Sequence, residues 1–169
     1  MTRPFQRNGR LGHASHIVPL VRAFDISQGD VLELGMGWYS TPILNWLCGV
    51  AGRQLFSYDD VSEWTAPVRR HRKDYHRVAM IENWETVPIE VPWGLALVDH
   101  SPAERRGIEI RRLANWAEYI VIHDTQVDKS YGLYGYDAIW PLFKYRYDYT
   151  RLLPQTTVVS NFHSLERMD

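Results

Sequence analysis

The segment at residues 31–40 constrains the fold of this chain more than any other stretch. It reads VLELGMGWYS: a short apolar run holding one acid, then Gly35 and Gly37, then residues suited to begin a helix. A second apolar run at residues 54–58 is followed by two aspartates. A strand, a glycine turn, a helix and a second strand with an acid at its tip form the layout of a nucleoside-binding α/β unit. The alternative is a tight strand-to-helix turn that binds no ligand.

The residue types of this turn suit a bound nucleoside. Glycine has no Cβ, so Gly35 and Gly37 can adopt positive φ and let a ligand approach the backbone. The helix that begins at Ser40 offers free N–H groups and the positive end of its dipole. Asp59 or Asp60, at the tip of the second strand, can accept hydrogen bonds from both ribose hydroxyls. We therefore expect a nucleoside to lie across the ends of these two strands.

The details of the turn favour a nucleoside without phosphate. A dinucleotide fingerprint needs a third glycine, which is absent, and Trp38 and Tyr39 crowd the place of a pyrophosphate. Glu33, at the end of the strand, would repel a phosphate and suits a cationic, amine-bearing ligand. S-adenosylmethionine has these properties, because it carries a sulfonium and an α-amino group.

Four segments in order resemble the motifs of class I S-adenosylmethionine-dependent methyltransferases, in particular the small O-methyltransferase-like branch. They are ELGMG at residues 33–37, SYDDVSEW at 57–64, LALVDHSP at 95–102 and YIVIHDT at 119–125. The resemblance covers roughly residues 31–125 and includes the Ser-Thr pair at residues 40–41. Each motif alone is weakly specific, but their order and spacing fit throughout.

The resemblance implies a set of cofactor-binding residues. Asp59 would hold the ribose, Trp64 would lie near the adenine, Glu33 would hold the amino end, and Asp99 would face the methyl group. Together with the turn, the expected cofactor-binding residues are Glu33, Gly35, Gly37, Ser40, Asp59, Asp60, Trp64 and Asp99.

Two pairs of polar residues, Asp99-His100 and His123-Asp124, follow neighbouring strands, and we treat all four as candidate catalytic residues. Asp99 and Asp124 could bind a hard cation such as Mg²⁺ through oxygen. The metal-dependent members of the family have asparagine where Thr125 stands, which leaves the third ligand in doubt. One of the histidines could act as a general base on a substrate hydroxyl. Alternatively, these residues only cap helices and hold loops.

Composition predicts one soluble domain spanning residues 1–169 and excludes several kinds of partner. Of the 169 residues, 45% are hydrophobic, and the formal net charge is −1. No global field draws the chain to nucleic acid or anionic lipid, and the basic run at residues 69–73 reads as a solvated helix face. No apolar run is long enough for a membrane span, and residues 1–7 lack a signal-peptide core. The single cysteine, Cys48, cannot form an internal disulfide. We therefore expect a cytoplasmic protein, and exposed aromatic residues leave a homo-oligomer possible.

The order of apolar segments predicts a doubly wound Rossmann-like α/β sheet that is mostly parallel, with an antiparallel pair at its edge and helices on both faces. The expected strands are residues 31–34, 54–58, 78–81, 94–98, 119–122, 144–149 and 156–160, and the expected helices are residues 14–24, 40–50, 62–74 and 103–117.

Three other segments have open roles. Arg105 resembles an arginine of the same methyltransferase branch that could pair with Asp99 or Asp124, but it also has helix-spaced glutamates nearby. The glycine- and aromatic-rich segment at residues 131–141 could be a substrate lid or an irregular helix packed on the sheet. Residues 12–16 could fold over the same site.

Together these features predict an S-adenosylmethionine-dependent methyltransferase that acts on oxygen of a small molecule. A non-catalytic S-adenosylmethionine-binding or regulatory module of the same fold remains the main alternative. A nicotinamide-dependent enzyme is disfavoured by the missing third glycine and by the bulk of Trp38 and Tyr39.

Overall fold

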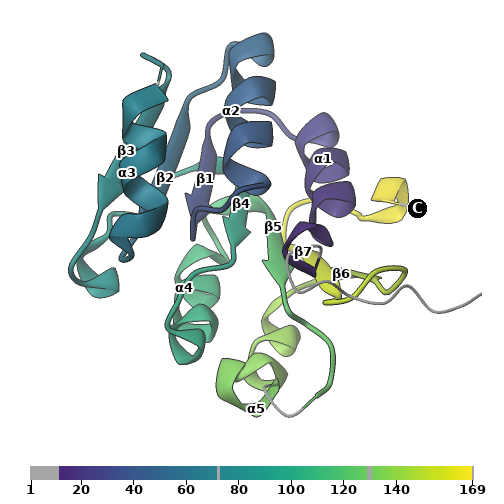
Figure 1. Ribbon diagram of the computed structural model, residues 1–169. Helices are drawn as coiled ribbons and strands as arrows, with labels where there is room; N and C mark the ends of the chain where they lie inside the picture. Colours follow the sequence, from purple (N-terminus) through teal and green to yellow (C-terminus); the bar gives the residue numbers. More distant parts are fainter. Residues whose placement is uncertain (1–11, 72, 129–130, 169) are drawn as a thin grey trace, which may run out of the picture.

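A seven-stranded sheet in the order β3-β2-β1-β4-β5-β7-β6 forms the centre of the molecule (Figure 1). The computed structural model describes residues 12–71, 73–128 and 131–168. The strands are β1 (Val31–Leu34), β2 (Leu55–Asp59), β3 (His76–Met80), β4 (Trp93–Val98), β5 (Ala117–His123), β6 (Tyr145–Tyr149) and β7 (Thr156–Ser160). Each lies within a few residues of its expected position.

The sheet is mostly parallel, as the sequence predicts. Neighbouring strands from β3 to β5 pair in parallel, whereas β7 is antiparallel to both β5 and β6. The antiparallel strand therefore lies one place in from the edge that β6 forms. This order confirms the Rossmann-like methyltransferase sheet.

Helices cover both faces of the sheet because its central strands are apolar on both sides. On one face, Leu95 and Leu97 of β4 pack with residues of α1 (Ile17–Ile26) and α2 (Ser40–Ala51). On the other, Ala96 and Val98 pack with Ile110 of α4 (Arg106–Leu113). Cys48 of α2 is fully buried in the first of these two clusters.

The helices differ from expectation mainly at their ends. α2 ends where Gly52 adopts a left-handed φ of 68°, as predicted for a glycine after a helix. The expected helix at residues 103–117 is shorter, because Ala103–Arg105 forms a 3₁₀ turn (η3) before α4 begins. α3 (Ser62–His71) ends three residues early, and the side chains at residues 69–72 of the basic run lie outside the described part.

The segment after β5 packs on the sheet as short helical turns. These are α5 (Tyr131–Tyr134), η4 (Tyr136–Ala138) and η5 (Trp140–Leu142). Tyr136 is fully buried and belongs to the core cluster that contains β4 and β5 residues. The irregular-helix alternative therefore describes this segment. The remaining 3₁₀ turns are η1 (Gly12–Ala14), η2 (Trp84–Thr86) and η6 (Glu166–Met168).

The strand order reverses direction between β1 and β4, which are neighbours. In open α/β sheets, ligands bind beyond the carboxyl ends of the strands at such a switch point. Within the described part of the chain, no helix has the length and apolarity needed to span a bilayer.

Candidate functional site

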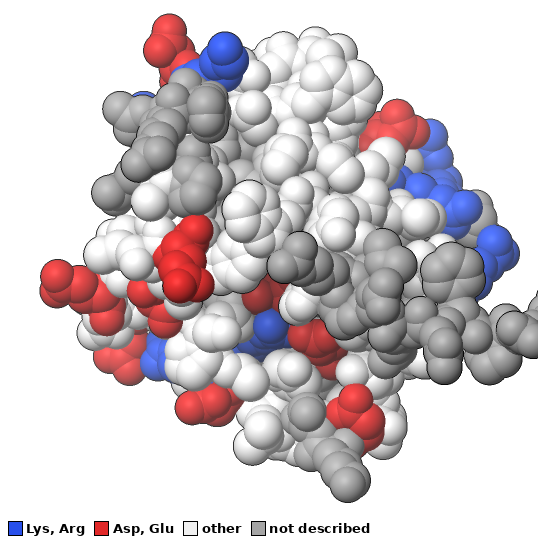
Figure 2. All heavy atoms as spheres, viewed as in Figure 1, with Lys and Arg blue, Asp and Glu red and all other residues white. Residues whose placement is uncertain are grey.

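A hollow of about 390 Å³ lies beyond the carboxyl ends of β1, β2, β4 and β5. Basic and acidic atoms lie side by side in the hollowed middle of the face shown in Figure 2. The residues that line the hollow are His13, His16, Met36, Gly37, Trp38, Tyr39, Ser40, Asp59, Val61, Trp64, Asp99, His100, Ser101, Arg106, His123, Asp124 and Pro154. The sequence left open whether residues 12–16 fold over this site, and His13 and His16 do line the hollow.

Gly35 and Gly37 have different tasks in the turn. Gly35 adopts a φ of 93°, and a Cβ placed there would lie 2.5 Å from the backbone of Asp99 and His100. Gly35 thus lets the end of β1 approach the end of β4, so its missing side chain makes room for protein rather than ligand. Gly37 lines the hollow, and its N–H donates to Thr41 Oγ1 at 3.0 Å.

Glu33 lies beneath the hollow and does not line it. Its carboxylate is fully buried and accepts hydrogen bonds from Thr41 Oγ1 at 2.9 Å and Ser57 Oγ at 2.6 Å. Burial raises the pKa of Glu33 to about 7, although these hydrogen bonds partly offset the effect. The expectation that Glu33 holds the cofactor's amino end does not fit this geometry. Instead, Glu33 supports Gly37 from below through Thr41.

Asp59 occupies the position predicted for a ribose-binding acid. Its two carboxylate oxygens accept hydrogen bonds from Met36 N at 2.7 Å and Val61 N at 2.8 Å, and the side chain lines the hollow. Burial raises the pKa of Asp59, although the backbone hydrogen bonds oppose this shift. Asp59 therefore joins the turn after β1 to the end of β2.

The other predicted residues on this side of the site separate into two groups. Ser40 and Trp64 line the hollow, and Trp64 packs edge-to-face with Trp38 at 5.7 Å between ring centroids. Asp60 does not line it, because its carboxylate accepts a hydrogen bond from Trp84 Nε1 at 3.3 Å. A ribose-binding role for Asp60 is therefore not supported by its placement.

Arg106 joins the two predicted acids at the ends of β4 and β5. Its guanidinium lies 3.0 Å from Asp99 Oδ1 and 2.9 Å from Asp124 Oδ2. Burial opposes the charge of Arg106, but the two carboxylates and the nearby Tyr134 and Tyr136 outweigh burial and raise its pKa. Asp124 has a φ of 60°, which is unusual for a residue other than glycine and is often found at functional sites.

Of the two roles that the sequence left open for Arg105, the pairing with helix-spaced glutamates is the one observed. Arg105 lies 2.7 Å from Glu109 at i,i+4 spacing and 3.1 Å from Glu85, and it is Arg106 that pairs with the two aspartates. The 3₁₀ turn before α4 changes which arginine faces the strand ends. The adjacent arginine in the sequence was the only signal that could have indicated Arg106.

His123, the last residue of β5, is buried between hydrogen-bonding partners. Its Nδ1 lies 3.1 Å from Asp99 Oδ1, and its Nε2 lies 2.9 Å from Ser15 Oγ. Burial opposes the charged ring, but Asp99 more than compensates, so the pKa of His123 is raised. Burial also opposes the charge of Asp99, yet His123 and Arg106 hold the pKa of Asp99 well below its usual range.

His100 lies at the rim of the hollow but faces away from it. Its ring stacks on Trp84 at 4.0 Å, Nδ1 donates to its neighbour's carbonyl, and Nε2 lies 3.6 Å from Glu109 Oε2. Burial lowers the pKa of His100 to about 3. A general-base role for His100 is therefore not supported, because its free nitrogen is directed into the protein.

The oxygen ligands expected for Mg²⁺ are not assembled among the described residues. Arg106 already binds one oxygen of Asp99 and one of Asp124. The hydroxyl of Thr125 is hydrogen-bonded to the hydroxyl of Thr157 at 2.9 Å. Because Mg²⁺ demands a near-ideal set of oxygen ligands, the predicted magnesium site is not supported.

Comparison with known proteins identifies the fold. No family model and no curated protein matches the sequence. Among solved structures, the O-methyltransferase TomG from Streptomyces achromogenes, in complex with SAM, has a TM-score of 0.58 at 12% identity, over 88% of this chain and 79% of that one. An O-methyltransferase from Bacillus cereus with SAH has a TM-score of 0.60 at 11% identity, over 94% and 84%. A complex of the Haloferax volcanii Trm112 methyltransferase activator with a putative methyltransferase gives 0.56 at 11% identity, over 92% and 95%.

These similarities define the class of structure to which the chain belongs. It has the fold of the class I S-adenosylmethionine-dependent methyltransferases, with its hollow at the switch point of the sheet.

Proposed function

We propose that this protein is an S-adenosylmethionine-dependent methyltransferase whose cofactor lies in the hollow beyond β1, β2 and β4. One observation carries the proposal. Asp59, at the tip of β2, lines a hollow at the switch point of the sheet together with Met36 and Gly37. Solved proteins of this fold include one in complex with SAM and one with SAH.

The residues around Asp59 and the two neighbouring tryptophans support this position for the cofactor. Each carboxylate oxygen of Asp59 accepts one backbone hydrogen bond, and a carboxylate has further lone pairs for ribose hydroxyls. A second, mostly apolar hollow of about 220 Å³ shares Gly37, Trp38 and Trp64 with the first. A flat aromatic base fits such a place, so the adenine would lie beside the two tryptophans.

The acceptor would lie on the other side, against Asp99, His123 and Asp124. These side chains and Arg106 give this end of the hollow a polar, hydrogen-bonding surface. Such a surface suits the hydroxyl of a small molecule, which is the acceptor we propose. Methyl transfer depends mainly on alignment and proximity, so these residues would chiefly orient the acceptor oxygen toward the methyl group.

Thermal unfolding in the presence of candidate ligands tests the cofactor. S-adenosylmethionine and S-adenosylhomocysteine at 100 times Kd should each stabilise the fold by about 2.7 kcal/mol, whereas NAD should not. Asp59→Asn should abolish most of this stabilisation. Asp60→Asn is the matched control, because Asp60 lies next to Asp59 but outside the hollow. Equal shifts with NAD, or no shift with any ligand, would overturn the proposal.

Turnover requires a separate assay. Formation of S-adenosylhomocysteine should depend on an added acceptor when phenols, sugars and hydroxy acids are screened. Binding of the cofactor without turnover of any oxygen acceptor would argue for a non-catalytic module instead.

A further inference from the structure

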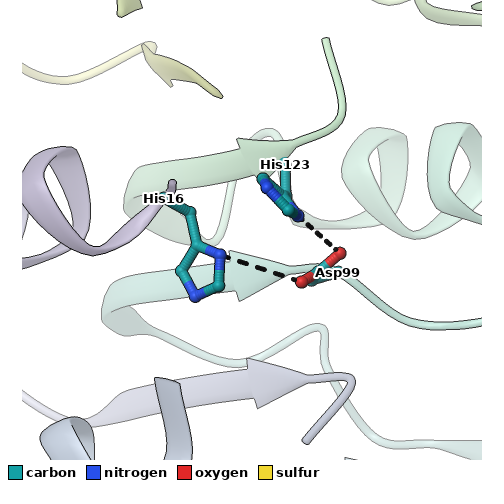
Figure 3. A group of neighbouring side chains, drawn as sticks. All are labelled: His16, Asp99 and His123. Carbon is teal, nitrogen blue, oxygen red and sulfur yellow. Dashed lines mark hydrogen bonds and ion pairs between the residues drawn. The ribbon is translucent and has the colours of Figure 1, made fainter. Parts of the chain in front are cut away.

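Three side chains from separate parts of the chain meet at one side of the hollow. His16 precedes α1, Asp99 follows β4 and His123 ends β5, and both imidazole rings are directed at the Asp99 carboxylate (Figure 3). His16 Nδ1 lies 3.9 Å from Asp99 Oδ2, and His123 Nδ1 lies 3.1 Å from Asp99 Oδ1. One ligand atom from each residue falls within 4.8 Å of the others.

His16 is buried without a hydrogen-bond partner among the described residues. Its side chain is 3% exposed, and neither ring nitrogen makes a hydrogen bond. A buried polar group without a partner costs about 1–3 kcal/mol, and such groups in native proteins usually mark a missing water, ion or ligand. Because His16 lines the hollow beside Asp99, the missing partner belongs at this place.

His123 is oriented as a metal-binding histidine would be. Its Nε2 lies 2.9 Å from Ser15 Oγ, which leaves Nδ1 facing Asp99. Metal-ligating histidines almost always use their second ring nitrogen in a hydrogen bond that fixes the ring. Between Nδ1 and a carboxylate oxygen there must be a positive centre, either a proton or a cation.

The local charges leave room for a cation. Arg106 binds Oδ1 of Asp99 and Oδ2 of Asp124, so Asp99 Oδ2 remains directed at His16. Two carboxylates and one guanidinium give a net charge of about −1 before a metal is added. Metal–nitrogen bonds of about 2.1 Å place adjacent ligands roughly 3 to 3.5 Å apart. The 3.9 Å between His16 Nδ1 and Asp99 Oδ2 would have to close by about 1 Å, and ligand atoms as far apart as 4.8 Å by up to about 2 Å.

We propose that His16 Nδ1, Asp99 and His123 Nδ1 bind a divalent first-row transition-metal ion whose remaining coordination positions face the hollow. Two imidazoles and one carboxylate suit zinc, iron or cobalt, whereas magnesium prefers oxygen ligands alone. The open positions would take oxygen ligands, from water or from a hydroxyl or carboxylate of a small molecule. The inference concerns these three side chains and stands independently of the proposed cofactor.

Titration of the metal-free protein with Co²⁺ tests this inference, because the position and intensity of the visible Co²⁺ bands change when protein ligands replace water. The wild type should bind one Co²⁺ per chain, Zn²⁺ should displace it, and Mg²⁺ should not. His16→Ala and His123→Ala should each weaken Co²⁺ binding at least 100-fold. His163→Ala is the matched control, since His163 is 48% exposed and pairs with Glu118, and it should bind like the wild type.

Because His16 and His123 are buried, their alanine variants must be shown to fold by circular dichroism. His16→Gln, which keeps a polar side chain of similar length, provides a second test should His16→Ala unfold. The absence of Co²⁺ absorption in the wild type would overturn the inference, as would wild-type affinity in a folded His16 variant. Thermal shifts with S-adenosylhomocysteine on the same samples, without metal, keep a failure of this site distinguishable from a failure of the proposed function.

Discussion

At the scale of single residues, Gly35 is the position where the fold has the least freedom. It combines a φ of 93° with a Cβ position only 2.5 Å from the backbone of Asp99 and His100. We therefore expect Gly35→Ala to cost more than about 4 kcal/mol in the free energy of unfolding, through strain and displacement of the β4 end. Gly52→Ala, with a φ of 68° but nothing within 4 Å, should cost only about 1 kcal/mol. Urea unfolding measures both, and equal losses would contradict this explanation.

Arg106 should matter far more than its neighbour. Arg106→Ala leaves two carboxylates, Asp99 and Asp124, without their shared cation, and breaking a buried ion pair typically costs about 3–5 kcal/mol. Arg105→Ala should cost less, because Glu85 is exposed and the buried Glu109 keeps Arg112 at 3.6 Å when Arg105 is removed. Chemical denaturation of the two variants at pH 7 decides the matter. A larger loss for Arg105 would contradict the pairing described here.

The sequence predicts which residues lie at the strand ends but not which way their side chains point. Asp59 and Asp99 were predicted at the site, and both line the hollow. Glu33 and Asp60 satisfy the same pattern, yet one is buried under the turn and the other reaches Trp84. The direction of a side chain after a strand depends on the loop that follows, and a motif does not encode that loop.

At the scale of elements, Glu33 connects β1, α2 and β2 through hydrogen bonds from Thr41 and Ser57. Burial raises its pKa from the ordinary value of 4.5 to about 7. A carboxyl group whose pKa is higher in the folded than in the unfolded state contributes its full stability at pH values below the unfolded pKa. This contribution is lost as the pH rises through the pKa of the folded state. Between pH 5 and 8 the wild type should therefore lose up to about 3 kcal/mol from this one group.

Glu33→Gln tests this link, because the amide keeps the shape of the side chain without titrating. The change in unfolding free energy from pH 5 to pH 8 should therefore be more positive in Glu33→Gln than in the wild type, by up to about 3 kcal/mol. Glu63→Gln, on the exposed first turn of α3, should leave the slope unchanged. A wild-type slope in Glu33→Gln would show that another group titrates.

Strands proved easier to predict than helix ends. β7 matches its predicted bounds at residues 156–160, because a short run of β-branched residues is distinctive. α4 begins at Arg106 rather than near residue 103, because a 3₁₀ turn and an α-helix have similar sequence preferences. That difference of less than one turn decides which arginine reaches the acids.

At the scale of the whole molecule, the order of motifs was sufficient to predict the sheet, because parallel strands with short crossovers allow few arrangements. The position of His16 was far less accessible. It reaches Asp99 and His123 only because α1 packs against β4, β5 and β7, and such contacts between distant parts of the chain leave no local pattern. The sequence could therefore suggest that residues 12–16 fold over the site, but it could not indicate that His16 would contact Asp99 and His123.

From the pKa shifts of the buried groups taken together, we expect the free energy of unfolding to be greatest near pH 6 to 7. Burial lowers the pKa of His16 and His76 to about 4 and of His100 to about 3. As pH falls below about 6.5, these histidines become protonated in the unfolded chain but stay neutral in the folded protein. The free energy of unfolding therefore decreases. Glu33 and His123 have raised pKa values and act in the opposite direction, so their stabilisation is lost as pH rises.

Urea unfolding from pH 4.5 to 9 should give a curve that falls on both sides of this maximum. His76→Gln should flatten the acid side, because glutamine can still bond to Ser57 but does not titrate. His163→Gln replaces an exposed histidine and should reproduce the wild-type curve. Since each pKa unit corresponds to about 1.4 kcal/mol, the effect of His76 alone lies well above the error of such measurements. Two results would contradict this prediction: a curve that changes in one direction only, or an acid side that His76→Gln leaves unchanged. Either would mean that the pKa values of these buried histidines are the same in the folded and the unfolded state.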